Sequence, residues 1–380
     1  MDVLHTCCAG LDVHKRTVVA CVRRVDPAGK VLKNTRTFAT MTRDLLNLAD
    51  WLTAQGVNVV AMESTGTYWK PVFNLLEPRL SVVLVNAHHI KQVPGRKTDV
   101  KDSEWIAQLL QHGLLRASFI PPRPTRELRD LTRQRTQLIG EKTAVANRIQ
   151  KVLEDANIKL GSVASNVLGV SGRDMIEAII RGELDPIKLA ERARRRLRGK
   201  IPQLRMALQG SVTEHHRFLL RTLMDHLGHL ERLIGRHNDR IAEALGPSEE
   251  LIDRITTIPG VDRRVAEVVL AEIGLEMGRF PTAGHLSSWA GMASGNHESA
   301  GKHQSGRTTP GNRWLKTALV QAAWAARRAK GTRLAEKFNR IARGRGVKRA
   351  AVAVGHTILV IIYHLMKEGT SYQEGEATAA

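Results

Sequence analysis

The 380-residue sequence contains few aromatic residues, few cysteines and too few acidic side chains to balance its basic ones. Phe, Trp and Tyr make up 4% of the residues, too little for base stacking on aromatic rings to be the main mode of nucleic-acid binding. The three cysteines, Cys7, Cys8 and Cys21, have neither metal-site nor disulfide spacing, so we expect small core residues in a reducing cytoplasm. Asp and Glu number 37 against 58 Lys and Arg, and the resulting net charge of +21 favours polyanionic partners.

Long hydrophobic runs are also scarce. The most apolar late segment, residues 350–366, is interrupted by His356 and His364 and falls short of the roughly 20 residues that span a bilayer, so we expect a buried helix. With no secretory signal or lipidation motif, nucleic acid is a better candidate partner than a membrane surface. The length and a hydrophobic content of 42% predict a globular protein of two or three domains.

The amino-terminal part alternates strand and helix patterns. Continuous or alternating apolar runs predict strands, the first two forming a hairpin, at residues 7–13, 17–22, 57–62 and 80–85. Apolar residues at helical spacing predict helices at residues 42–55, 69–76 and 102–115. Strands separated by helices imply an α/β domain with a partly parallel sheet covered on both faces.

A proline-rich break at residues 121–124 ends this part, because proline cannot continue a helix. Beyond it, apolar residues recur every seven positions at Leu131, Leu138, Val145 and Val152. A second stretch, residues 223–245, has apolar residues in four-three steps. Both patterns predict long paired helices, within the chain or between chains.

A dense basic run at residues 192–200 lies between the two helical stretches and includes Arg194, Arg195 and Arg196. It is either a solvated helix face or a contact with nucleic-acid phosphates, and the overall charge favours the second.

After Gly246-Pro247, residues 251–274 predict two short helices joined by a turn that contains Gly260. Such a turn resembles a helix-hairpin-helix element, whose backbone N–H groups suit an anion, although any corner between two helices looks similar. We then expect a polar loop at residues 294–312 and helices from 314 to 366.

Asp12 lies inside the first predicted hairpin, and three further acids, Glu63, Asp99 and Asp102, recur at the ends of later predicted elements. A carboxylate in a central strand is costly to bury without a partner, which suggests a shared metal ion. Hard oxygen ligands suit Mg²⁺ or Mn²⁺, and two such ions assist phosphodiester chemistry. The alternative is that Asp12 is a hydrogen-bonded turn residue and the other acids are surface residues.

These acids lie in three motifs that resemble the RuvC-like "DEDD" motifs of one group of bacterial transposases, the insertion sequence one-ten family: Gly10-Leu11-Asp12-Val13-His14-Lys15, Glu63-Ser64-Thr65-Gly66 and Lys97-Thr98-Asp99-Val100-Lys101-Asp102. The resemblance continues in Ile258-Pro259-Gly260, Glu298-Ser299-Ala300-Gly301-Lys302 and Gly311-Asn312-Arg313-Trp314-Leu315. The sequence departs from the family at Ser103, where alanine is more frequent, and in its long Arg-rich middle region.

The resemblance implies three domains: an RNase H-like catalytic domain at residues 1–122 that holds Mg²⁺, a helical coiled-coil connector at 123–248 and a mainly helical transposase domain at 249–380. It implies a serine nucleophile, carried over to Ser299, with Lys302 and His303 as nearby charge stabilisers. It further implies donor and target DNA, a structured guide RNA, a homo-oligomer and the cytoplasm of a bacterium, at the nucleoid.

Under this hypothesis the protein is a DNA recombinase that cuts and rejoins strands through a phosphoserine ester, with the serine activated by the metal held at the acids. Ser305 is the fallback nucleophile. One alternative is a junction-resolving nuclease that uses the four acids and a water nucleophile. Another is a non-enzymatic scaffold for nucleic acid, for which the basic surplus would suffice.

Overall fold

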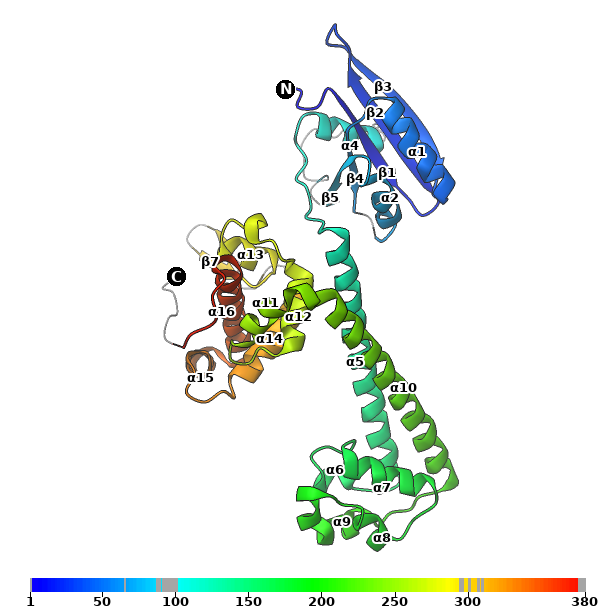
Figure 1. Cartoon of the computed structure of the whole chain (residues 1–380), viewed down its shortest axis with the longest axis vertical. Helices are drawn as coiled ribbons and strands as arrows, with labels where there is room; N and C mark the ends of the chain where they lie inside the picture. The colour runs from blue at the N-terminus through cyan, green and yellow to red at the C-terminus, as the bar shows by residue number, and fades with distance from the viewer. Residues whose placement is uncertain are drawn as a thin grey trace. The chain divides into compact units, whose positions relative to one another are not determined.

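The computed structural model describes residues 2–64, 66–86, 90, 102–293, 297–299, 302–305, 308 and 311–374. Asp99 and several residues around Ser299 therefore lie outside the described part. The chain divides into two compact units, Met1–Pro121 and Pro122–Ala380, shown in Figure 1. Each is described by itself.

The first unit is built on a five-stranded sheet with the strand order β3-β2-β1-β4-β5. The strands are β1 (Cys7–Val13), β2 (Thr17–Val25), β3 (Val31–Ala39), β4 (Val59–Glu63) and β5 (Ser81–Val85). The first three strands pair antiparallel, whereas β1, β4 and β5 run parallel. Helices α1 (Thr42–Ala54) and α2 (Trp69–Leu76) share a core with the sheet, and α4 (Asp102–Gln111) packs in a second core with β1, β4 and β5. This mixed sheet is compatible with an RNase H-like fold.

Strand β3 has no counterpart among the predicted elements. Of its nine residues only Phe38 is buried, because the strand forms the edge of the sheet and seven of its side chains are exposed. Its backbone pairs with β2 along its full length. Backbone hydrogen bonds need no apolar pattern, so hydrophobic periodicity does not detect such a strand.

The second unit begins with α5 (Arg123–Asp155), which packs along α10 (Glu214–Leu245) in the same chain. Leu138, Val145, Ile149 and Leu153 of α5 share a buried core with residues of α10. The buried series passes from Val145 to Ile149 and Leu153 and leaves Val152 half-buried, because a straight helix drifts away from a seven-residue repeat. Figure 1 shows short helices at the end of this pair: α6 (Leu160–Val163), α7 (Val170–Ile180), α8 (Pro186–Ala190) and α9 (Ile201–Ala207). A short 3-10 helix, η1 (Arg195–Lys200), precedes α9.

At the other end of the α5–α10 pair the chain forms a helical domain. Its helical elements are η2 (Gly246–Ser248), α11 (Glu249–Thr256), α12 (Arg263–Ile273), η3 (Met277–Arg279), α13 (Ala283–Trp289), α14 (Arg313–Ala326), α15 (Arg333–Arg345) and α16 (Val347–Glu368). Among the described residues, α16 is the one helix long and apolar enough to cross a membrane; it packs against α14 and α15, and half of its most apolar stretch is buried.

Candidate active site

Helix α4 lies directly on strand β1 because residue 10 is glycine. A Cβ atom on Gly10 would lie 2.2 Å from the carbonyl oxygen of Ser103 and 2.3 Å from the backbone nitrogen of Ala107. Any other residue at this position would push the helix off the sheet. The contact places Asp102, the first residue of α4, over the end of β1 that carries Asp12.

Glu63 comes to the same sheet edge through the parallel pairing of β1 and β4. Leu11 is registered with Met62, so the next residues along the two strands are Asp12 and Glu63. Parallel strands end at the same edge, which explains why acids separated by about fifty residues meet there.

The carboxyl group of Asp12 has like charges near it. Burial raises the pKa of the Asp12 carboxyl, and the negative charges of Asp102 and Glu63 raise it further. His14 opposes this shift, because its Nε2 atom lies 3.0 Å from Oδ2 of Asp12. Asp12 is therefore a partly buried carboxylate among like charges, with one exposed histidine as its counter-charge.

The donor set of this acidic cluster (Asp12, Glu63 and Asp102) consists of carboxylate oxygens, the ligands that Mg²⁺ and Mn²⁺ prefer. Within the described residues, no three His, Cys, Asp or Glu side chains lie close enough together to hold a metal ion. Asp99, the fourth predicted ligand, lies outside the described part. The residues fit a divalent cation in chemistry, and the magnesium site stays a prediction.

His14 is a residue of this site to which the sequence prediction gave no role. Its signal was present in the first motif, where the histidine follows Asp12 by two positions. His14 lies directly after β1, where its backbone nitrogen donates to the Thr17 carbonyl at 2.9 Å, and its imidazole lies beside the carboxylate.

The backbone of Ser299 lies in a short hairpin of the second unit. Strand β6 (His297–Ser299) pairs antiparallel with β7 (Lys302–Ser305), and Ser299 is registered with Lys302 and Glu298 with His303. The prediction of a loop at residues 294–312 is wrong for these strands, because two short polar strands pair through their backbones without an apolar core. The side chains of Ser299, Lys302, His303 and Ser305 lie outside the described part.

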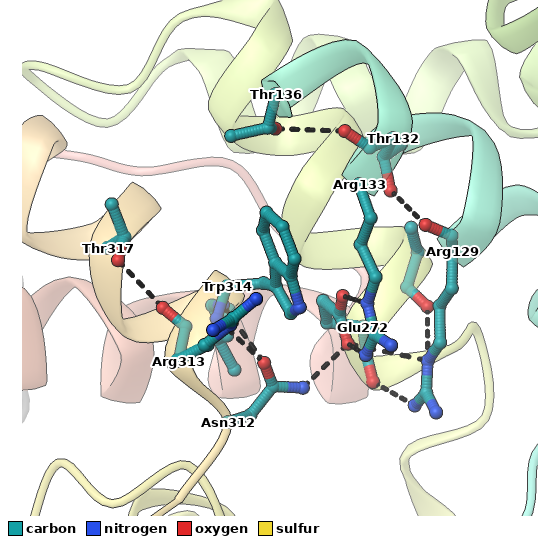
Figure 2. Close-up of polar contacts among 11 residues, drawn as sticks. Arg129, Thr132, Arg133, Thr136, Glu272, Asn312, Arg313, Trp314 and Thr317 are labelled. Atoms are coloured by element: carbon teal, nitrogen blue, oxygen red, sulfur yellow. Dashed lines mark hydrogen bonds and ion pairs between the residues drawn. The ribbon is translucent and has the colours of Figure 1, made fainter. Parts of the chain in front are cut away.

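A buried glutamate anchors the chain that follows this hairpin (Figure 2). Glu272 of α12 is fully buried, and Arg133 of α5 donates to its carboxylate from Nε at 2.7 Å and from Nη2 at 2.8 Å. Asn312 donates to the same carboxylate from Nδ2 at 2.6 Å. Arg129 donates to the backbone carbonyls of Ala271 and Glu272. Glu272 thus joins α5, α12 and the start of α14.

The motif of residues 311–315 holds the start of α14 in place. Asn312 caps the helix, because its Oδ1 atom accepts from the backbone nitrogens of Trp314 and Leu315 at 3.1 and 3.2 Å. A Cβ atom on Gly311 would lie 2.3 Å from the backbone nitrogen of Gly291. Lys316 donates from Nζ to the Gly291 carbonyl at 3.1 Å and to Thr308 at 2.6 Å. The two segments that flank the hairpin are therefore tied together.

Two family models match the chain over these two sites. One, described as Transposase and of the DEDD and IS110 type, matches residues 9–158. The other, described as Transposase IS116/IS110/IS902 family, matches residues 252–339. The chain belongs to this family of transposases.

Two relatives agree with this assignment. The transposase is 28% identical over 304 residues to "Insertion element IS110 uncharacterized 43.6 kDa protein" of Streptomyces coelicolor, an alignment that covers 74% of this chain and 73% of the relative. It is 23% identical over 373 residues to "Transposase for insertion sequence element IS1111A" of Coxiella burnetii, which covers 96% and 91%. The matched family stretches include the acidic cluster and the Ser299 hairpin but not residues 159–251.

The predicted anion-binding turn of the transposase lies between α11 and α12. Gly260 has φ +87°, and a Cβ atom on it would lie 2.4 Å from the carbonyl oxygen of Ala322, so this glycine is required for packing against α14. A cavity of about 770 Å³ lies beside the turn, and the exposed Arg264 and Arg313 line it. Neither arginine forms an ion pair within the described residues, and the Arg313 guanidinium lies over the Trp314 ring, 4.7 Å from its centroid. Asp262 and Glu272 also line the cavity. Phosphate binding at the turn stays a prediction.

Proposed function

We propose that this transposase moves an insertion sequence by cutting and rejoining DNA strands, with Asp12, Glu63, Asp99 and Asp102 as the catalytic acids. The observation that carries the proposal is the placement of three acids at one sheet edge: Asp12 and Glu63 lie near the ends of neighbouring parallel strands, and Asp102 begins the helix packed on β1. Burial and the charges of Asp102 and Glu63 raise the pKa of Asp12. A fold that only needed stability would not place three like charges together, because each raises the free energy of the others.

Mg²⁺ held by these four acids would neutralise them and draw electron density from a phosphodiester. Asp12, partly buried beside His14, would help hold that ion at this edge of the sheet. The close contact at Gly10 supplies rigidity, because α4 cannot shift away from β1 without losing its packing.

We further propose that the Ser299 hydroxyl is the nucleophile. Its oxygen forms a bond to phosphorus, the phosphorus–oxygen bond to one sugar breaks, and the leaving DNA end takes up a proton as a free hydroxyl. The phosphoserine ester keeps the energy of the broken bond, so a second DNA end restores the phosphodiester by the reverse reaction. The hairpin anchored by Asn312 and Lys316 would present this serine.

The proposed partners are donor and target DNA and a structured RNA that pairs with both. The net charge of +21 and the exposed Arg264 and Arg313 at the cavity beside Gly260 support binding to phosphate backbones. Under RNA guidance the protein need not read bases itself, which agrees with the low aromatic content. A homo-oligomer, in the cytoplasm at the bacterial nucleoid, completes the proposal. Sequencing the RNA that co-purifies with the protein tests the guide directly.

The experiment that tests the chemistry is a denaturing gel of labelled DNA after reaction with Mg²⁺. We expect a covalent protein–DNA adduct with the wild type, and its loss by about a thousandfold or more in Ser299→Ala with DNA binding retained. Ser305→Ala is the matched control and keeps the adduct. Asp12→Asn removes both the adduct and the cut ends.

Free cut ends without any adduct would instead support the nuclease that uses a water nucleophile. Unchanged function of Asp12→Asn without metal would support a scaffold and contradict the catalytic role of the acids.

A further inference from the structure

Short helices lie at the far end of the α5–α10 pair (Figure 1). Residues of this region line a cavity that neither family match covers. Its volume is about 530 Å³. The residues that line it include four cationic side chains, from Arg194, Arg195, Arg196 and Lys200, and no acidic one. A cavity with this charge balance suits an anion.

The arginines differ in whether a carboxylate already neutralises them. Arg194 is paired with Asp174 at 2.8 Å, whereas Arg195 and Arg196 are exposed and form no ion pair within the described residues. Arg195 is held at φ +54°, a left-handed conformation uncommon for a residue other than glycine. Two guanidinium groups are therefore available at the cavity.

The first turn of α7 also lines the cavity. Its N-cap residue, Gly169, has no side chain to accept a hydrogen bond, and the backbone N–H groups of Val170, Ser171 and Gly172 have no acceptor within the described residues. The first N–H groups of a helix attract anions, because they are unsatisfied and lie at the positive end of the helix dipole. Guanidinium donors and helix donors thus line the same space.

We infer that this cavity binds a phosphate of a nucleic-acid backbone, and that the distal helices are a second nucleic-acid contact of the transposase. A phosphodiester oxygen accepts from both kinds of donor, and Arg forms paired hydrogen bonds with phosphate. No base-reading group is needed, so the contact is independent of sequence. The identification of the ligand as nucleic acid rests on the proposed function. The charge and the volume of the cavity are observations that do not depend on it.

The test compares two double variants of the full chain. Arg195→Gly with Arg196→Ala removes the two unpaired charges, and glycine suits the backbone at residue 195. Arg198→Ala with Arg205→Ala is the matched control: it removes the same charge from the same region, but both arginines pair with Glu191 and neither lines the cavity.

Binding is measured by fluorescence anisotropy in EDTA, on a Ser299→Ala background, with a labelled DNA duplex and an RNA duplex of the same sequence. We expect the cavity variant to bind at least one of them about tenfold more weakly, and its salt dependence for DNA to fall by about 2 in slope. The control should lose far less. A loss confined to DNA or to RNA identifies which backbone occupies the cavity.

Equal losses in the two double variants, or no loss in either, would overturn the inference. Because no cutting is required, a failure of the proposed chemistry leaves this result intact, and the reverse also holds.

A second pair of variants tests the helix N-terminus without removing an arginine. Gly169→Asp and Gly169→Asn both add an N-cap side chain to α7, but only the aspartate places a negative charge at the cavity. We expect the aspartate variant to bind several-fold more weakly than the asparagine variant, at similar thermal stability. Equal affinities would contradict the role of the helix.

Discussion

Asp12 in the first unit is a partly buried carboxylate and Glu272 in the second a fully buried one, and they are compensated in opposite ways. Glu272 is fully buried and accepts hydrogen bonds from Arg133 and Asn312, which are part of the fold. Asp12 has one exposed histidine beside it and two further acids in its surroundings, so its pKa is raised, chiefly by burial.

This difference in compensation distinguishes a structural carboxylate from a carboxylate that can still bind a cation. Burying a charge is tolerated when fixed donors satisfy it, and Glu272 meets this condition inside the protein. The compensation of Asp12 is incomplete, so an added cation gains more at Asp12 than at Glu272. The acid that the fold leaves under-compensated is therefore the better candidate for function.

The largest expected effect on stability comes from removing the partner of the structural carboxylate. Arg133→Ala leaves Glu272 buried with Asn312 and Arg129 alone, and we expect the free energy of unfolding of the second unit to fall by about 2–3 kcal/mol. Urea unfolding, followed by hydrogen exchange in α5 and α12, measures this loss.

Arg123→Ala on the same helix is the control for Arg133→Ala. Its ion pair with Glu127 is exposed on both sides, so the expected loss is below about 0.5 kcal/mol. Arg133→Lys keeps the charge but not the paired hydrogen bonds and should lie between the two. If Arg123→Ala and Arg133→Ala lower the free energy of unfolding equally, the buried ion pair contributes no more than the surface pair, which contradicts the prediction.

The next effect is stabilisation of the first unit by Mg²⁺. At roughly a hundredfold excess over its Kd, the ion adds about 2.7 kcal/mol to the free energy of unfolding of a protein that binds it only when folded. We expect slower hydrogen exchange in β1 and α4 with Mg²⁺ in the wild type, and no such change in Asp12→Asn.

Asp50→Asn supplies the matched acid-to-amide control for the magnesium experiment, since Asp50 pairs with Arg79 at the surface. It should keep the response to Mg²⁺. A wild type that does not respond at all would contradict the predicted metal site while leaving the structural role of Glu272 untouched.

The smallest expected effect is the pH dependence of stability in the absence of metal. Because the pKa of Asp12 is raised above its usual 3.8 in the folded state, the folded protein holds this proton more tightly than the unfolded chain. The stabilisation is complete below pH 3.8 and is lost as the pH rises through the raised pKa. In EDTA, Asp12→Asn should therefore gain stability relative to the wild type on going from acid to neutral pH.

Thermal unfolding across this pH range measures the difference. A difference that stays constant with pH would show that Asp12 is not perturbed. Mg²⁺ should reverse the trend, because it binds the ionised carboxylate.

Hydrophobic pattern was sufficient for elements that bury one face. Helix α2 was predicted with its observed bounds, and α1 and β5 within one residue. It was insufficient where backbone pairing alone makes the element, as in β3 and in the β6–β7 hairpin. The position of Asp12 beside Glu63 followed from the expectation of parallel strands.

The ion pair between Glu272 and Arg133 could not be predicted from sequence patterns. Arg133 is 139 residues away in the chain, and no periodic pattern links the two. The cavity at Arg195 and Arg196 could not be predicted from the sequence either, because a basic run does not show which of its charges are paired.

By itself the sequence determined the alternation of strands and helices, the excess of positive charge and the position of each acid along the chain, since local propensity and periodicity are properties of neighbouring residues. Only the tertiary structure decided which charges are neutralised. Compensation of a charge depends on distances of a few ångströms between residues far apart in the chain, and packing alone fixes those distances.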